Sequence, residues 1–285
     1  MNKIIKSVAL PLAMLPTLAF GQATATYTVL SNPVPGDGIT GLAIDANGMA
    51  YATVTDRNLY EVDLTTGAFT LVGALSIVVR DLAIDTSGQL YGMCGNDNDL
   101  CTIDSSTGVA SLVSSNTTDG AYPAISFIGS TLYYVRTGSA GGGTIDTATG
   151  QSTDIGVPSD GSTTYGSTGL GYDPASGLLI GHDCCDQGVG GQALVTFDPS
   201  DLTTTVIGFP TGTQQFHDFA VHNGVVYAVT GGAGQGLDDG GTFGSVALNL
   251  PQPPAPATPV PTLPLFGLLT LGGLLGLFGL RKLKR

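Results

Sequence analysis

Apolar and polar residues alternate in short runs between residues 24 and 250, and the runs come in pairs. Each pair is joined by a tight turn that carries Gly or Asn-Gly, which is typical of a β-hairpin. Similar hairpins begin at Gly41, Asp81, Ala124, Gly169 and Asp218, which lie 40, 43, 45 and 49 residues apart. Recurrence at this period indicates a repeat architecture.

A second hairpin follows the first one in four of the five units. In three of them the turn reads Asp-x-x-Thr-Gly, beginning at Asp63, Asp104 and Asp146. The Asp carboxylate can accept hydrogen bonds from backbone groups two residues on, and the Gly supplies a positive φ. Four strands per unit, repeated around an axis, predict a β-propeller.

The strand count predicts five blades. The last unit has its first hairpin at 217–230 and a third strand at Ser245–Leu250, but no fourth strand before a proline-rich stretch begins. One unpaired strand, Thr26–Ser31, precedes the first unit. We therefore expect an all-β fold, a five-bladed propeller over residues 24–250, in which the N-terminal strand completes the outside of the last blade.

Residues 1–21 have the features of a signal peptide. Lys3 and Lys6 form a basic start, a short apolar run follows, and small residues precede a cleavage point after Gly21 or after Ala23. This predicts export through the Sec machinery.

The C-terminal end has three parts. Residues 251–261 form a Pro-rich linker, and residues 262–280 carry no charge and are long enough to cross a bilayer. The chain then ends in the basic residues Arg281, Lys282, Lys284 and Arg285. A transmembrane helix in the inner membrane, with its C-terminus in the cytoplasm, is predicted for 262–285.

This tail resembles the sorting signals that exosortases handle in Gram-negative bacteria, the PEP-CTERM group and its IPTL-CTERM relatives. The residues that carry the resemblance are Val260, Pro261, Thr262, Leu263, Phe266 and Gly267. Members usually carry Trp where Phe266 stands, which leaves the subfamily open. The resemblance implies a membrane protease that cuts near Pro261-Thr262 and passes the domain to the cell surface or the extracellular space. A permanent single-span anchor is the alternative.

The charge distribution excludes nucleic acid as the main partner. The whole chain has a formal net charge of −13, but residues 24–250 hold all 22 acidic residues and only three basic ones, a net charge of −19. Phosphate binding needs a basic surface instead. Seven of the acidic residues fall at repeat turns, where backbone hydrogen bonding explains them: Asp45, Asp63, Asp85, Asp104, Asp146, Asp173 and Asp198.

Four cysteines are compatible with export to an oxidising compartment. Cys94 and Cys101 flank the loop between the second and third strands of the second blade, so a disulfide between them is favoured. Cys184 and Cys185 are adjacent, which leaves a vicinal disulfide or two free thiols, with metal binding or an intermolecular bond as further alternatives.

Candidate binding residues lie on the face with the irregular loops, because binding sites usually form on such loops. Six residues at strand starts or in blade connections could converge there: Arg80, Asp81, Tyr122, Tyr165, His217 and Asp218. Calcium is the candidate metal, since two loops offer carboxylates without cationic neighbours, at Asp97 and Asp99 and at Asp238 and Asp239. For His217 a packed, structural role is favoured over a binding role, and for the two acidic loops a solvated hairpin tip is favoured over a calcium site.

No catalytic motif is recognisable, and the chain has no Trp and a single Glu. The four-strand period and the Asp-x-x-Thr-Gly turn resemble quinone-binding and lactonase-like propellers, but the quinone-binding repeats dock through a Trp, so no cofactor residue carries over. The leading hypothesis is a non-enzymatic surface or matrix module, with surface polysaccharide as a candidate partner. The alternative is a periplasmic lactonase-like hydrolase, which would need three or more oxygen ligands around Ca²⁺ at the axis.

Overall fold

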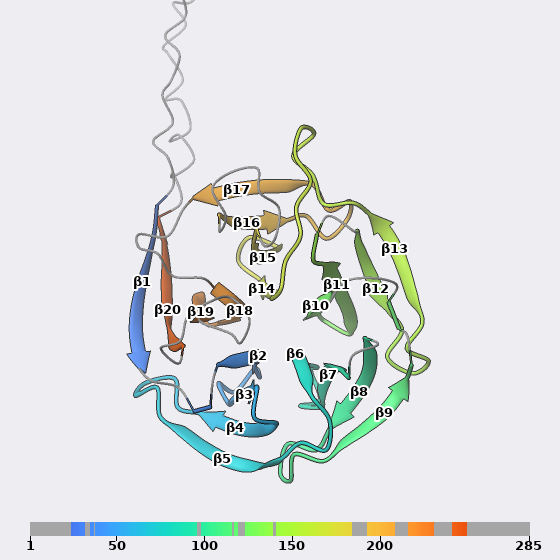
Figure 1. The fold of residues 1–285 in the computed structure, drawn as a ribbon. Coiled ribbons are helices and arrows are strands. Elements are labelled where there is room, and N and C mark those ends of the chain that lie inside the picture. Colours follow the sequence, from blue (N-terminus) through green and yellow to red (C-terminus); the bar gives the residue numbers. More distant parts are fainter. Residues whose placement is uncertain are drawn as a thin grey trace, which may run out of the picture. The chain divides into compact units, whose positions relative to one another are not determined.

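The computed structural model describes residues 24–31, 35–36, 38–95, 98–115, 117–118, 123–138, 141–183, 193–208, 216–230 and 241–249. These residues form five four-stranded antiparallel sheets, which stand as blades around a central axis (Figure 1). The predicted five-bladed β-propeller is therefore confirmed.

Each of the first four blades is a run of four consecutive strands, as the repeats predicted. Blade 1 holds β2 (Ile39–Ile44), β3 (Ala50–Val54), β4 (Asn58–Val62) and β5 (Phe69–Ala74). Blade 2 holds β6 (Val79–Ile84), β7 (Leu90–Cys94), β8 (Asp99–Ile103) and β9 (Ala110–Ser114). Blade 3 holds β10 (Pro123–Ile128), β11 (Thr131–Arg136), β12 (Gly142–Ile145) and β13 (Ser152–Gly156). Blade 4 holds β14 (Gly171–Asp173), β15 (Leu178–His182), β16 (Leu194–Phe197) and β17 (Thr204–Gly208).

Blade 5 joins the two ends of the domain. It consists of β18 (Phe216–His222), β19 (Val225–Thr230), β20 (Thr242–Asn249) and, outermost, the N-terminal strand β1 (Thr24–Ser31). β1 is antiparallel to β20, with Thr24 opposite Asn249 and Val29 opposite Gly244. The predicted closure is confirmed, although both strands begin earlier than the sequence pattern indicated.

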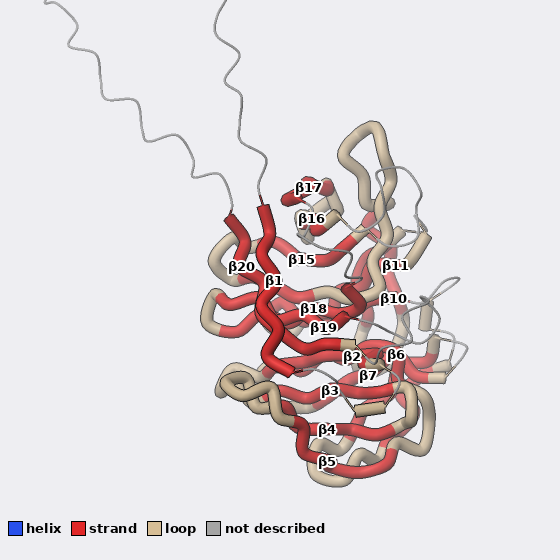
Figure 2. The backbone as a smooth tube through the Cα atoms, turned by 60° about the vertical axis from the view of Figure 1, so that its left-hand side comes forward, coloured by secondary structure: helices blue, strands red, loops and turns tan. Residues whose placement is uncertain are grey.

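The first strand of every blade lies nearest the axis (Figure 1), and β1 runs beside β20 at the outer edge of blade 5 (Figure 2). The second residue of each repeat is a large apolar side chain that is at most 2% exposed: Leu42, Leu82, Ile125, Leu170 and Phe219. The hydrophobic clusters join neighbouring blades; Leu42 of blade 1, for example, belongs with Ala220 and Val229 of blade 5. The core thus lies between the blades.

The repeat turns are held by their aspartates, as predicted. In the turn of blade 1, Asp63 Oδ1 accepts the N–H groups of Thr65 and Thr66 at 2.8 and 2.9 Å. Gly67 follows with a φ of +70°. Much of the acidity of the domain is therefore structural.

Blade 4 departs from the repeat, because its first strand begins at Gly171 and spans three residues rather than starting at Gly169. The Ser167 hydroxyl accepts the His182 N–H at 3.2 Å and donates to the Gly169 carbonyl at 2.7 Å. This side chain bridges Gly169 and His182, beyond the end of the ladder that pairs β14 with Leu178, Leu179 and Ile180 of β15.

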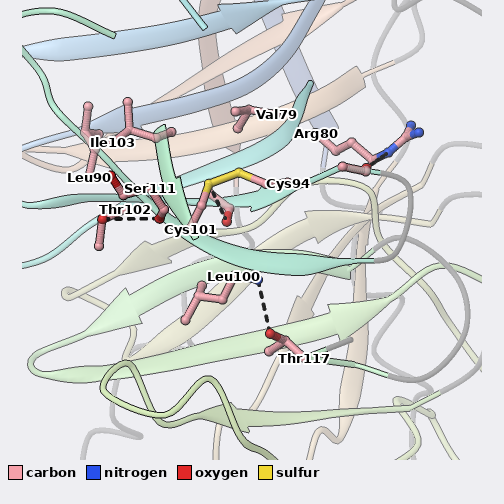
Figure 3. Close-up of a disulfide and its surroundings, with 12 residues drawn as sticks. Val79, Arg80, Leu90, Cys94, Leu100, Cys101, Thr102, Ile103, Ser111 and Thr117 are labelled. Atoms are coloured by element: carbon pink, nitrogen blue, oxygen red, sulfur yellow. Dashed lines mark hydrogen bonds between the residues drawn. A yellow bond between two sulfur atoms is a disulfide. The ribbon is translucent and has the colours of Figure 1, made fainter. Parts of the chain in front are cut away.

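A disulfide joins Cys94, at the end of β7, to Cys101 in β8, which confirms the favoured pairing (Figure 3). It closes the second-to-third-strand loop of blade 2 on the side of the ring where the first strands begin. Cys184 and Cys185 lie outside the described residues.

The predicted signal peptide, linker and transmembrane tail also lie outside the described residues and stay predictions. The boundary between the two units of the chain falls between Leu250 and Pro251. Within the described part, no helix is long and apolar enough to cross a membrane.

Replacing Gly244 tests the closure. A Cβ at Gly244 would overlap the Thr28 carbonyl oxygen of β1, whereas a Cβ at Gly156, at the end of β13, would meet its nearest atom only at 3.7 Å. We expect Gly244→Ala to lower the free energy of unfolding by about 2 kcal/mol, as overpacking does, and Gly156→Ala to leave it nearly unchanged. Urea denaturation of the full-length chain measures both, and equal effects would contradict the closure.

Candidate functional site

Two carboxyl groups meet on the axis of the propeller. Asp81 opens the repeat of blade 2 and Asp218 that of blade 5, and they are 1% and 0% exposed. The two blades are not neighbours, yet the side chains are hydrogen-bonded to each other. Both belong to the six residues that the sequence predicted to converge on the face with the irregular loops. The structure brings them together as a pair, called here the axial carboxyl pair.

Each oxygen of the pair accepts one backbone N–H. For Asp81 the donors are Leu82 at 2.7 Å and Ile125 at 2.6 Å. For Asp218 they are Phe219 at 2.7 Å and Leu42. Asp81 thereby joins blade 2 to blade 3, and Asp218 joins blade 5 to blade 1. Four of the five first strands are held in this way.

These N–H groups need the carboxylates because they belong to the free inner edge of each blade. The first strand of a blade pairs with the second strand on one side only, so its other edge faces the axis without a neighbouring strand. A buried N–H without a partner costs roughly 1–3 kcal/mol. Two aspartates provide four acceptor oxygens, which removes this cost in four blades at once.

A β-bulge directs each carboxyl to the axis. The pairing register shifts between Val79 and Asp81 in blade 2, and between Phe216 and Asp218 in blade 5. The extra residues in these bulges are Arg80 and His217. Bulges commonly re-aim a side chain in this manner.

The corresponding positions in blades 1 and 4 are glycines because the neighbouring blade leaves no space. A Cβ on Gly41 would lie 2.8 Å from the Leu82 nitrogen, and one on Gly169 would overlap the Asp218 Cα. With Ala124 in blade 3, the ring at the axis reads Gly, Asp, Ala, Gly, Asp. Only two blades carry a hydrogen-bonding side chain at this level.

Burial raises the pKa of both carboxyls, and the neighbouring Asp81 raises that of Asp218 further. Burial is the main cause at Asp81, where the pKa rises to about 8. At Asp218 burial and then the neighbouring Asp81 charge raise the pKa well above its usual value. Two close carboxylates cannot both ionise easily, so the pair retains a shared proton at neutral pH.

Two histidines of neighbouring blades lie close to each other: His182 is buried, and His217 is half-buried beside Asp218 in β18. His182 at the end of β15 is 3% exposed. The Thr168 hydroxyl lies 2.9 Å from the His217 carbonyl and 3.1 Å from His182 Nε2. Since that hydroxyl donates its single proton to the carbonyl, His182 donates from Nε2 and its Nδ1 carries a lone pair.

Neither imidazole is protonated near neutrality. Burial lowers the pKa of His182 to about 3, with a smaller contribution from His217, and lowers the pKa of His217 to about 4. The Nδ1 atoms of both rings are buried without a hydrogen-bond partner among the described residues. The sequence favours a packed, structural role for His217, but it carries no signal for the proximity of His217 to His182.

The other candidate residues lie apart from the axis. Arg80 Nε donates to the Gly95 carbonyl at 3.1 Å, which holds the guanidinium against the loop after β7. Tyr165 is 1% exposed in the core between blades, and its hydroxyl donates to Asp160 at 2.9 Å. Tyr122 lies outside the described residues.

The calcium hypothesis concerned four aspartates. Asp99 lies in β8, opposite Cys94, whereas Asp97, Asp238 and Asp239 are outside the described residues. Within the described chain, no group of three or more His, Cys, Asp or Glu side chains is placed to hold a metal ion.

The pH dependence of stability tests the axial carboxyl pair. Because the folded pKa of Asp81 lies above its unfolded value, its contribution is present at low pH and is lost as the pH rises through about 8. We expect the free energy of unfolding to fall between pH 6.5 and 8 by about 1.4 kcal/mol per pH unit for one retained proton. Urea denaturation at each pH measures this slope.

Asp218→Asn should reduce the slope, because it removes a buried carboxyl whose own pKa is raised well above its usual value, whereas Asp160→Asn, at an exposed turn, should leave the slope intact. The histidines act with the opposite sign: their folded pKa values lie below 6.5, so their contribution is lost as the pH falls toward 4. A stability that rises from pH 6.5 to 8 would contradict the shared proton.

The fold resembles that of solved propellers. A nidogen/laminin complex matches 75% of this chain and 86% of its own, at 13% identity and a TM-score of 0.49. The PQQ-bound aldose sugar dehydrogenase of Streptomyces coelicolor (14% identity, 78% and 98% coverage) and the calcium-binding protein regucalcin of Agrobacterium tumefaciens (17%, 80% and 96%) have the same TM-score of 0.49. At these identities the likeness concerns the fold alone. No family model and no curated protein matches the chain.

Proposed function

We propose that the protein is an exported surface or matrix protein whose propeller is a binding and structural module. The observation that carries this proposal is the engagement of the axial carboxyl pair. All four oxygens accept backbone N–H groups, and the carboxyls bond to each other. The acidic groups nearest the axis thus hold neighbouring blades together, as expected of a scaffold.

The positions of the chain ends support the proposal. Val226, which follows the first turn of blade 5, lies opposite Val246, and Asn249 lies three residues further on beside Thr24. Both ends of the domain therefore emerge at the outer edge of blade 5, at the end of the blade that carries this turn. The loops between second and third strands are at the opposite end of the strands.

This arrangement suits a tethered module. If the segment after residue 250 anchors or sorts the protein, as its resemblance to exosortase signals implies, the loop face is directed away from the attachment point. The Thr-, Ser- and Gly-rich loops of an acidic domain suit a neutral surface polysaccharide better than an anionic one. We infer that the loop face binds such a polysaccharide.

Paired variants on the two faces test this function. Arg57, in the second-to-third-strand loop of blade 1, and Asn223, in the first turn of blade 5, are both exposed and have φ values of 65° and 50°. On a panel of neutral surface polysaccharides, we expect the full-length chain to bind at least one. Arg57→Glu should weaken that binding at least threefold, and Asn223→Glu should leave it unchanged. Binding to none, or an equal loss in both variants, would contradict the proposal.

Two further measurements separate the proposed function from the hydrolase and the sorted protein from a permanently anchored one. Lactone hydrolysis that depends on Ca²⁺ would favour the hydrolase, whereas we expect no turnover above the buffer rate. The mass of the mature surface form tests the sorting step. We expect the mature form to lack residues 265–285. If it retains them, the permanent single-span anchor is correct and the sorting step is not.

A further inference from the structure

The dipeptide Asn-Gly occurs twice in the sequence, each time in the first turn of a blade. Asn47-Gly48 joins β2 to β3 in blade 1, and Asn223-Gly224 joins β18 to β19 in blade 5. Both asparagines are exposed. In an Asn-Gly dipeptide the glycine nitrogen can attack the side-chain amide of the asparagine, because no Cβ on the glycine hinders its approach. The two turns are therefore candidates for the same chemical modification.

The turn of blade 1 is held by an aspartate. Asn47 Nδ2 donates to Asp45 Oδ2 at 3.3 Å, and the Asn47 backbone N–H donates to Asp45 Oδ1 at 2.9 Å. The Gly48 N–H, which carries the attacking nitrogen, donates to the Asp45 carbonyl at 3.1 Å. Both reacting groups would have to leave these bonds before they could meet. Asp45 thus protects Asn47.

The turn of blade 5 has no such restraint. His222 stands at the repeat position that Asp45 has in blade 1, so no carboxylate caps the turn. Asn223 and Gly224 have φ values of 50° and 74°, and the Gly224 N–H makes no hydrogen bond to another described residue. A Cβ at Gly224 would meet no atom within 4 Å. The attacking nitrogen of this turn is therefore unbonded within the described structure and lies in open space.

An imidazole contacts the amide that would leave. Asn223 Nδ2 lies 2.8 Å from His222 Nε2. Because an amide nitrogen only donates, Nε2 accepts this bond through its lone pair. The same ring lies against the turn of blade 1, where a Cβ on Gly48 would be 3.0 Å from Nε2. One histidine thus contacts both Asn-Gly turns, which differ in how the reacting groups are restrained.

We propose that Asn223 is a site of deamidation, in which the Gly224 nitrogen attacks the side-chain Cγ and His222 assists the departure of the amide. The bond from the Gly224 nitrogen to Cγ forms and the Cγ–Nδ2 bond breaks, which gives a succinimide ring and ammonia. The proton that the Gly224 nitrogen loses is balanced by the one that Nδ2 gains, and His222 Nε2 delivers it. Water then opens the ring to aspartate or isoaspartate. Blade 5 thereby gains a negative charge at the turn that lies against blade 1, while Asn47 keeps its amide.

Peptide mapping by mass spectrometry tests this site, after incubation of the full-length chain in oxygen-18-labelled water at neutral pH. The labelled oxygen enters only those side chains that are deamidated during the incubation. We expect the label at Asn223 to accumulate about tenfold faster than at Asn47, because the hydrogen bonds to Asp45 must break before Asn47 can react. Asn223→Gln should remove the label from this turn, since a glutamine would have to close a larger ring.

His222→Gln and His222→Ala test the role of the imidazole. We expect both to slow the labelling of Asn223 by about threefold or more, because they remove the group that passes the proton. If the contact with His222 only restrained the amide, both variants would speed the labelling instead. Loss of the fold would also free the turn and speed it, so a slower rate cannot arise from unfolding.

Three results would overturn the proposal. These are no label at Asn223, equal labelling of Asn223 and Asn47, and labelling of Asn223 that is unchanged or faster in both His222 variants. None of these measurements involves a ligand, so they are independent of polysaccharide binding at the loop face.

Discussion

The free inner edge of each blade is the constraint on which the rest of the domain depends. Five first strands face the axis, and no further strand pairs with their inner edges. The N–H groups on these edges therefore need other hydrogen-bond acceptors. Asp81 and Asp218 meet this need with two side chains whose four oxygens take up N–H groups from four blades. As a consequence two carboxyls are buried, and burial raises the pKa values of both, so that the pair retains a shared proton.

Other features of the ring follow from the same constraint. The bulges at Arg80 and His217 turn the two carboxyls inward, and Gly41 and Gly169 let the remaining first strands approach where a Cβ would collide. At the outside of the ring, β1 pairs with β20 and so supplies the fourth strand that blade 5 would otherwise lack. It also brings both ends of the domain to one point and leaves the irregular loops at the other end of the strands.

Much of this fold could be predicted from the sequence, because propeller blades repeat a local pattern. The hairpin period, the turn aspartates such as Asp63 and the missing fourth strand of the last unit each predicted a feature that the structure confirms. The short β14 could not be predicted, since the Ser167 hydroxyl bridges Gly169 and His182 where the backbone ladder would otherwise continue. That substitution depends on a tertiary contact, which local patterns do not encode.

The site was predictable only in its position. Asp81 and Asp218 stood at equivalent repeat positions, so the axis was a reasonable location for both. Their mutual hydrogen bond depends on the bulges and on the number of blades between them. The His182–His217 neighbourhood depends on blade 4 packing against blade 5, and Tyr165 turned out to be a core residue. These contacts join residues that lie far apart in the sequence, and the pattern of a single sequence does not show which distant residues meet.

The shared proton of the axial carboxyl pair is the central claim, and a carbon-13 NMR titration of the aspartate carboxyl carbons tests it most directly. The account predicts that the resonances of Asp81 and Asp218 show a proton retained through neutral pH and a transition near pH 8, while turn aspartates such as Asp63 titrate below their usual range. Assignment by Asp81→Asn and Asp218→Asn identifies the pair. If every aspartate carboxyl were fully ionised at pH 6, the account would be contradicted.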